Sequence, residues 1–138
     1  MSTSTATLTT TRGEKATTSL RRTTIVVGLA AAAATTAVAA AVHAAGVPFD
    51  VDGQIPLLAF AQMTLLGAVI GGAVAAIIKR RSDVPARRFV QVTAVLLALS
   101  CVPSVALPPD LATKIALVST HLVAAAIIVP VLTRQLDH

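Results

Sequence analysis

The sequence predicts an all-α protein: a four-helix transmembrane bundle with up-down topology and both termini in the cytoplasm. Hydrophobic residues make up 55% of the 138 residues and charged residues only 12%, whereas a soluble domain usually carries about 25% charged residues. Four apolar runs are each long enough to cross a bilayer. In addition, 10 of the 11 Lys and Arg residues fall on one side of the membrane when the four runs alternate in direction.

The chain begins with a Ser/Thr-rich segment, residues 1–22, which precedes a four-span membrane domain at residues 23–134. Eleven of the first 20 residues are Ser or Thr. Such a segment buries too little apolar surface to offset the entropy lost on ordering. We therefore expect a disordered cytoplasmic tail, followed by an alanine-rich first span at about residues 24–45.

Arg21 and Arg22 leave an alternative open for the first span, namely a cleavable secretory signal. The small residues Ala39, Ala40 and Ala41 resemble a cleavage site, and the Arg-Arg pair weakly resembles a twin-arginine signal. Against cleavage, the apolar run is about 22 residues long, whereas a signal-peptide core is about 7–15 residues. We favour a retained span, and three further spans follow in either case.

The second span, at about residues 57–78, carries small residues on one face. Gly67 and Gly71 have the Gly-xxx-Gly spacing that lets membrane helices approach closely. We expect these glycines to pack against another helix, in the same chain or in a second copy. In the connection before this span, Asp50 and Asp52 indicate an acidic turn rather than a calcium loop, because the chain has no distal glutamate to complete an EF-hand.

The third and fourth spans are expected at about residues 89–107 and 112–132. Prolines follow the third span, and Asp110 is well placed to cap the amino end of the next helix. Because the connections are short, neighbouring spans should be antiparallel.

Basic residues set the expected orientation and the expected partners. Cytoplasmic segments of membrane proteins carry an excess of Lys and Arg. With a cytoplasmic N-terminus, only Lys114 lies outside, and the inner segments hold Arg12, Lys15, Arg21, Arg22, Lys79, Arg80, Arg81, Arg87, Arg88 and Arg134. We expect a multi-pass plasma-membrane protein that contacts the lipid bilayer and anionic headgroups at its cytoplasmic face, with a second copy or another membrane protein as a further partner. Nucleic acid is not expected, because basic residues do not alternate with aromatic ones.

His121, near the middle of the fourth span, is the strongest candidate for a functional residue. An ionisable side chain inside a membrane is costly and is a functional candidate by default. At 1.5 Å per residue, several small polar residues fall at a similar depth, roughly 10–15 Å below the outer boundary: Thr35, Thr36, Thr64, Ser100 and Cys101. This pattern predicts an intramembrane polar layer. We favour a structural role for His121, in hydrogen bonds across helices, over a proton relay or substrate contact, because no second titratable group lies in a span.

No catalytic residue, cofactor site or metal site is predicted. The nucleotide-binding, zinc-protease and nucleophile-elbow motifs are absent from the sequence, and a single cysteine precludes a disulfide within the chain. Haem ligation by two histidines is also disfavoured. His43 lies roughly 30 Å from the inner end of its span and so sits at the outer interface, whereas His121 lies roughly 13 Å below the outer end of the fourth span.

The fourth span contains the residues Lys114, Ala116, Leu117, His121, Leu122, Ala125 and Pro130. This pattern resembles a family of small four-span membrane proteins from actinobacteria that has no assigned function. The resemblance extends over roughly residues 20–134. It implies a polytopic plasma-membrane protein and no particular catalytic residues.

Together, these features favour a structural or accessory membrane protein of the cell envelope, without enzymatic activity. The alternative is a small transporter or proton-coupled membrane component that uses His121. A membrane enzyme or redox subunit is the least supported class, because the spans contain a single candidate acid–base residue.

Overall fold

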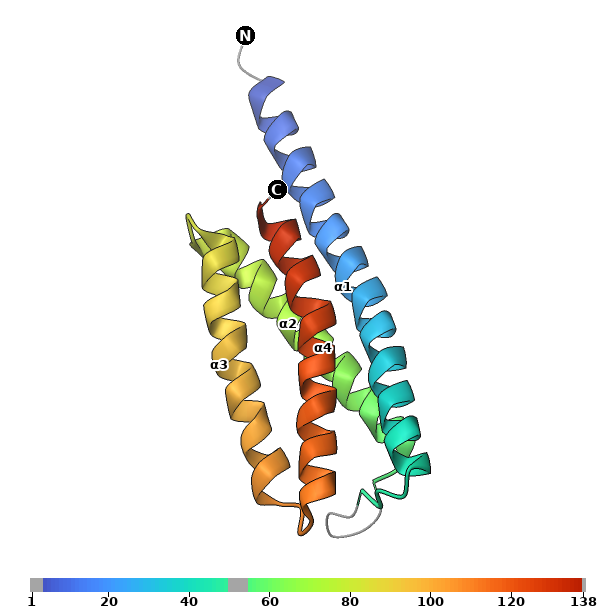
Figure 1. Cartoon of the computed structure of the whole chain (residues 1–138). Helices are drawn as coiled ribbons and strands as arrows, with labels where there is room; N and C mark the ends of the chain where they lie inside the picture. The colour runs from blue at the N-terminus through green and yellow to red at the C-terminus, as the bar shows by residue number, and fades with distance from the viewer. Residues whose placement is uncertain (1–3, 50–54, 138) are drawn as a thin grey trace.

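The computed structural model describes residues 4–49 and 55–137, with side chains from Thr18 onward. It contains α1 (Ser4–Ala44), α2 (Leu57–Arg81), α3 (Pro85–Ala106) and α4 (Leu111–Asp137). Successive helices run in opposite directions, as Figure 1 shows. The predicted all-α, four-helix fold is confirmed, and all four helices are long and apolar enough to cross a membrane. The start of α1, the α2–α3 turn and the end of α4 lie toward one end of the bundle, which we call the terminal end.

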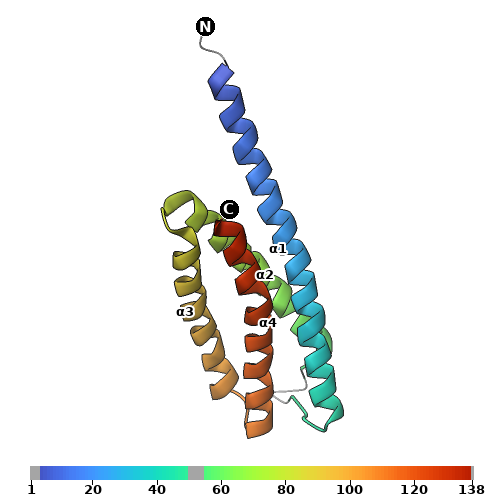
Figure 2. The same cartoon turned by 45° about the horizontal axis from the view of Figure 1, so that its top comes forward.

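The first helix begins far earlier than the sequence suggested. Residues 4–22, for which we expected disorder, are helical and continuous with the first span. The start of α1 projects beyond the other three helices (Figures 1 and 2). Nucleation is the costly step in helix formation, whereas extending an existing helix adds one hydrogen bond for each residue fixed. The span therefore serves as the nucleus, and good helix formers such as Glu14 and Ala16 allow it to extend.

A glycine cap ends α1. Gly46 has a φ of 96°, in the left-handed region that residues with a Cβ avoid. Its N–H donates to the His43 carbonyl at 2.9 Å, and the Val47 N–H donates to the Val42 carbonyl at 3.3 Å. This pair of bonds is a Schellman motif, which satisfies carbonyls left free at the helix end.

The other connections are fixed by local chemistry. The predicted cap is confirmed, since the Thr113 N–H donates to Asp110 Oδ2 at 2.7 Å at the start of α4. Pro85 begins α3, where its fixed φ is already helical and its missing N–H is not needed. The predicted acidic turn at Asp50 and Asp52 lies outside the described residues.

The first helix holds the bundle together. It packs against both α2 and α4, whereas α3 packs mainly against α4 and touches α2 sparsely. Leu20 of α1 belongs to the buried apolar cluster at the terminal end, and Ala39 belongs to the cluster at the opposite end. Cleavage of α1 as a signal would therefore remove part of both clusters, and this favours a retained span.

Phenylalanine side chains fill the two apolar clusters. Phe89 is fully buried at the terminal end. At the other end, the rings of Phe49 and Phe60 meet edge-on with centroids 5.1 Å apart. Phe49 is 1% exposed and has a φ of 48°, a strained backbone conformation for a bulky residue. Its ring packs against Phe60 and His43, and its carbonyl accepts from the Ile55 N–H at 3.1 Å.

The outer faces of the helices leave much apolar surface uncovered in the isolated chain. Large side chains on the outer helix faces are more than half exposed, for example Leu58, Val95 and Leu111. A soluble protein of this size rarely exposes so much contiguous apolar surface. In a membrane, lipid tails would cover these faces at no cost.

Candidate functional site

Two of the predicted polar residues join α1 to α2. Thr35 Oγ1 lies 2.9 Å from Thr64 Oγ1, and Thr35 is 1% exposed. Thr35 also donates to the Ala31 carbonyl of its own helix at 3.0 Å. Thr35 Oγ1 also lies 3.1 Å from the Ala32 carbonyl oxygen, and when its proton bonds either carbonyl, Thr64 donates to Thr35. Both hydroxyl groups are satisfied, and the bond ties the two helices together within the apolar interior.

The imidazole of His121 is half-buried on α4 and bonds to its own helix. Nδ1 lies 2.8 Å from the Leu117 carbonyl oxygen. Since the carbonyl is only an acceptor, Nδ1 carries the proton, and in the neutral ring the lone pair lies on Nε2. The predicted hydrogen bonds from His121 to Ser100, Thr35 or Thr36 are not present in the structure.

The register of the helices nevertheless places these residues at one depth. Leu20 shares a cluster with Leu136, and Ala39 shares the other cluster with Ala116. Because α1 and α4 are antiparallel, this pairing brings residues 34–36 level with His121. The bond between Thr35 and Thr64 brings Thr64 to the same level, although His121 is not bonded to either threonine.

Two further members of the layer do not reach another helix. The Ser100 hydroxyl donates to the Leu97 carbonyl at 2.8 Å, one turn earlier on α3. The Thr36 hydroxyl oxygen is buried on α1 and has no hydrogen-bond partner among the described residues. Cys101, next to Ser100, is a free, half-buried thiol. The layer thus contains one interhelical link and several side chains bonded locally or not at all.

The close contact between α1 and α2 does not use the predicted Gly67. Gly67 is exposed, and a Cβ there would meet nothing within 4 Å. Gly71 faces α4, where a Cβ would lie 4.0 Å from Leu132 Cδ1. The tight positions are instead Gly28 and Gly72, which the sequence pattern did not single out. A Cβ on Gly28 would lie 2.9 Å from Ala68 Cβ, and a Cβ on Gly72 only 2.5 Å from Thr24 Cγ2.

Sequence reasoning also missed two contacts near the helix ends. His43 is exposed, and its ring stacks on Phe49 with a centroid distance of 6.2 Å, while Nδ1 bonds the Val47 carbonyl at 3.1 Å. At the terminal end, Lys79 Nζ donates to the Gln135 carbonyl at 3.0 Å. A cation near the carboxyl end of a helix is favourable because of the helix dipole. The Lys-Arg-Arg run at the end of α2 was the available signal, but the partner of Lys79 on α4 was not predictable.

Charged residues in the described part of the chain cluster at the terminal end. The exposed or half-exposed cations at this end are Arg21, Arg22, Lys79, Arg80, Arg81, Arg87, Arg88 and Arg134. The opposite end holds Lys114 and Asp110. The backbone N–H of Thr113, which donates to the carboxylate, and the nearby Lys114 lower the pKa of the Asp110 carboxyl below its usual value. Within the described residues, no three His, Cys, Asp or Glu side chains meet in a group that could hold a metal ion.

Comparison with known proteins places the chain in a family. The model of a family of unknown function, DUF6069, matches residues 15–138. The chain belongs to the DUF6069 family. No curated protein and no solved structure matches it. The family match covers all four spans, the polar layer and the basic terminal end, so family membership supports a small multi-pass membrane protein without specifying an activity.

Proposed function

We propose that this DUF6069 protein is a structural or accessory component of the cell envelope, without enzymatic activity, in the plasma membrane of an actinobacterium. Both termini face the cytoplasm. The hydrogen bond between Thr35 and Thr64 carries the proposal of a structural role. Both intramembrane hydroxyl groups form hydrogen bonds, and one of these bonds joins two helices. Hydroxyl groups used in this way support helix packing.

The cytoplasmic placement of the terminal end rests on charge. The eight cations of the terminal end would face the side of the membrane that retains positive charge. Single-cysteine labelling tests this orientation in a Cys101→Ala background. Ser82→Cys in the α2–α3 turn should resist a membrane-impermeant maleimide in intact cells and react after lysis. Labelling of Ser82→Cys in intact cells would reverse the proposed orientation.

A structural or accessory role can be tested separately from orientation. Deletion of the protein should alter envelope integrity or the amount of a membrane partner, and Thr64→Val should reproduce part of that effect by weakening the bundle. A full deletion phenotype in a variant that accumulates and unfolds like the wild type would point to chemistry instead of structure.

The second candidate is a small transporter or proton-coupled component that uses His121. One observation favours it: the bond to Leu117 leaves Nε2 with a lone pair on a half-buried ring, level with the other polar side chains. Because the imidazole bonds only its own helix among the described residues, His121→Gln and His121→Leu should both accumulate at wild-type levels. Loss of cellular function in both variants would favour proton transfer, since neither side chain titrates near neutral pH. Retained function in both would leave the structural role.

A further inference from the structure

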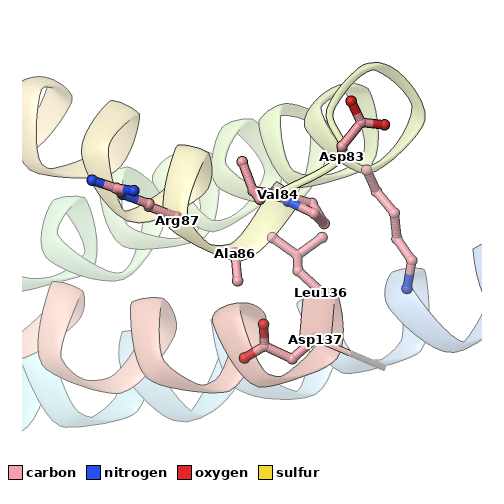
Figure 3. Close-up of a pocket in the computed structure, with 8 residues that line it drawn as sticks. Asp83, Val84, Ala86, Arg87, Leu136 and Asp137 are labelled. Atoms are coloured by element: carbon pink, nitrogen blue, oxygen red, sulfur yellow. The ribbon is translucent and has the colours of Figure 1, made fainter.

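The hollow between the α2–α3 turn and the end of α4 has balanced charges. Figure 3 shows Asp83 and Asp137 on opposite sides of it and Arg87 at one edge. Lys79 also lines it, so two cations face two carboxylates and the hollow selects no ligand by charge. The outer side of α2 carries a more specific feature, an amide side chain that faces away from the bundle.

This amide belongs to Gln62. It is exposed, and so are its neighbours on the same side of α2, Leu66 and Val69. At 100° per residue these three side chains fall within about 60° of one another. Ala68 and Gly72 lie on the other side of the helix and are buried where α2 meets α1. In a membrane, Gln62 therefore faces lipid tails instead of another helix of its own chain.

Gln62 lies inside the apolar part of the span. It is placed between Phe60 and Thr64 on α2. Phe60 shares a buried cluster with Ala116 of α4, and Thr64 is level with His121 through its bond to α1. The depth of Gln62 is thus between the levels of Ala116 and His121, where hydrocarbon surrounds the helix.

The carboxamide of Gln62 has no hydrogen-bond partner among the described residues. Lipid tails offer neither donors nor acceptors, so an unpaired amide in hydrocarbon is costly. Gln91 of α3 is also exposed, but it lies three residues from Arg88 at the terminal end, where water and headgroups reach it. Gln62 therefore needs a partner that neither its own chain nor the lipid tails supply.

We propose that two copies of the chain pair through this side of α2, with Gln62 of one copy bonded to the partner's Gln62. Copies inserted in one direction are related by a twofold axis along the membrane normal, which brings residues near the axis to their own counterparts at the same depth. A carboxamide has both donors and an acceptor, so each amide donates to the oxygen of the other. Ala73 is exposed on the same side, about three turns further along α2, and its small side chain lets the two helices approach closely. This inference rests on the proposed membrane insertion, which gives the copies a common direction.

Disulfide cross-linking in membranes tests the pairing in a Cys101→Ala background. Leu66→Cys lies one turn from Gln62 on the same side and leaves the amide intact, so oxidation with copper phenanthroline should link it into a dimer. Leu99→Cys is the matched control. Leu99 is 65% exposed on α3 but lies off the proposed interface, so this variant should remain monomeric.

Removal of the amide tests the hydrogen bond itself. Gln62→Leu should lower the cross-linked fraction of Leu66→Cys. It should also weaken association of the purified full chain in an uncharged detergent, measured by sedimentation equilibrium, at least about fivefold, because two reciprocal interhelical bonds are lost. Gln91→Leu makes the same chemical change on α3 and should change association by less than about twofold.

Several results would overturn the pairing. Equal cross-linking of Leu66→Cys and Leu99→Cys would show random collision. Unchanged association of Gln62→Leu would show that the amide reaches the headgroups instead of a second copy, and a cross-linked product with a different protein would replace the second copy by that protein. An unchanged circular dichroism spectrum of each variant establishes that it is folded. Release of the protein from membranes by alkaline carbonate would instead refute membrane insertion, so failure of the pairing and failure of the proposed function are distinguishable.

Discussion

Replacing Gly72 by alanine should wedge α1 and α2 apart. The added Cβ would lie 2.5 Å from Thr24 Cγ2, 2.7 Å from Thr24 Oγ1 and 3.1 Å from Thr24 Cβ. Thr24 cannot easily rotate away, because β-branched side chains are stiff in helices and its hydroxyl donates to the Leu20 carbonyl at 2.8 Å. Overpacking of this kind costs about 1–3 kcal/mol. The alanine also gains about 1 kcal/mol of helix propensity, so the net loss is smaller than the packing cost.

Gly67→Ala on the same helix isolates the packing cost. It makes the same chemical change and the same change to the unfolded chain, but its Cβ meets nothing within 4 Å. The free energy of unfolding, measured by SDS titration in mixed micelles and followed by circular dichroism, should therefore be about 1–3 kcal/mol lower for Gly72→Ala than for Gly67→Ala.

Thr24→Ala supplies a second check on the same contact. It removes the two atoms nearest to the new methyl group, so combining it with Gly72→Ala should recover at least about 1 kcal/mol relative to the sum of the single variants. Equal stability of the Gly67 and Gly72 variants, or strict additivity with Thr24→Ala, would refute the close approach of α1 and α2 at this position.

Two further predictions concern single hydrogen bonds. Thr64→Val should lower the free energy of unfolding by about 0.6–1.7 kcal/mol, the range for interhelical bonds in membranes. Thr93→Val is the control, because the Thr93 hydroxyl bonds only its own helix, and it should lower the free energy of unfolding by less. Equal losses in the two variants would show that the bond from Thr64 to Thr35 contributes nothing to stability. At Asp110 the folded-state pKa lies below the usual 3.8, so the carboxylate cap contributes stability that is present above about pH 3.8 and is lost as pH falls through the lower folded-state pKa. Asp110→Asn should keep a cap and flatten that acid-side loss in detergent unfolding curves, and an unchanged pH profile would refute the linkage.

Features that depend on local sequence were predictable. A span must satisfy its own backbone hydrogen bonds in lipid, so length and hydropathy suffice to locate it. The Asp110 cap requires only an acceptor next to the free N–H groups at the start of α4. The helical extension before the first span shows where this reasoning stops. Composition describes the isolated tail, but it does not include the nucleus that the adjoining span supplies.

The faces of the helices were not predictable in the same way. Lipid tails are as apolar as a leucine-rich core, so hydrophobic periodicity does not separate the packed face of a span from its lipid-facing side. The Gly-xxx-Gly spacing selected Gly67 and Gly71, whereas the closest approach to α1 is at Gly72, one step of 100° further around the helix. On α1 the tight position is Gly28, which faces Ala68 of α2. The alanine run that follows Gly28 offers many other small residues, so the sequence did not single out this glycine.

The polar layer shows how far depth counting can go. It predicted one level for His121, Thr35, Thr64 and Ser100, and the cluster contacts of α1 and α4 place Thr35 level with His121. It could not decide their hydrogen bonds, because a Ser, Thr or His side chain in a helix can turn back to a carbonyl three or four residues earlier. Ser100 and His121 use this local option, and Thr64 bonds across to α1. His121 therefore contributes little to helix register, and any chemistry that it performs would have to begin at Nε2, the ring nitrogen that the Leu117 bond leaves free.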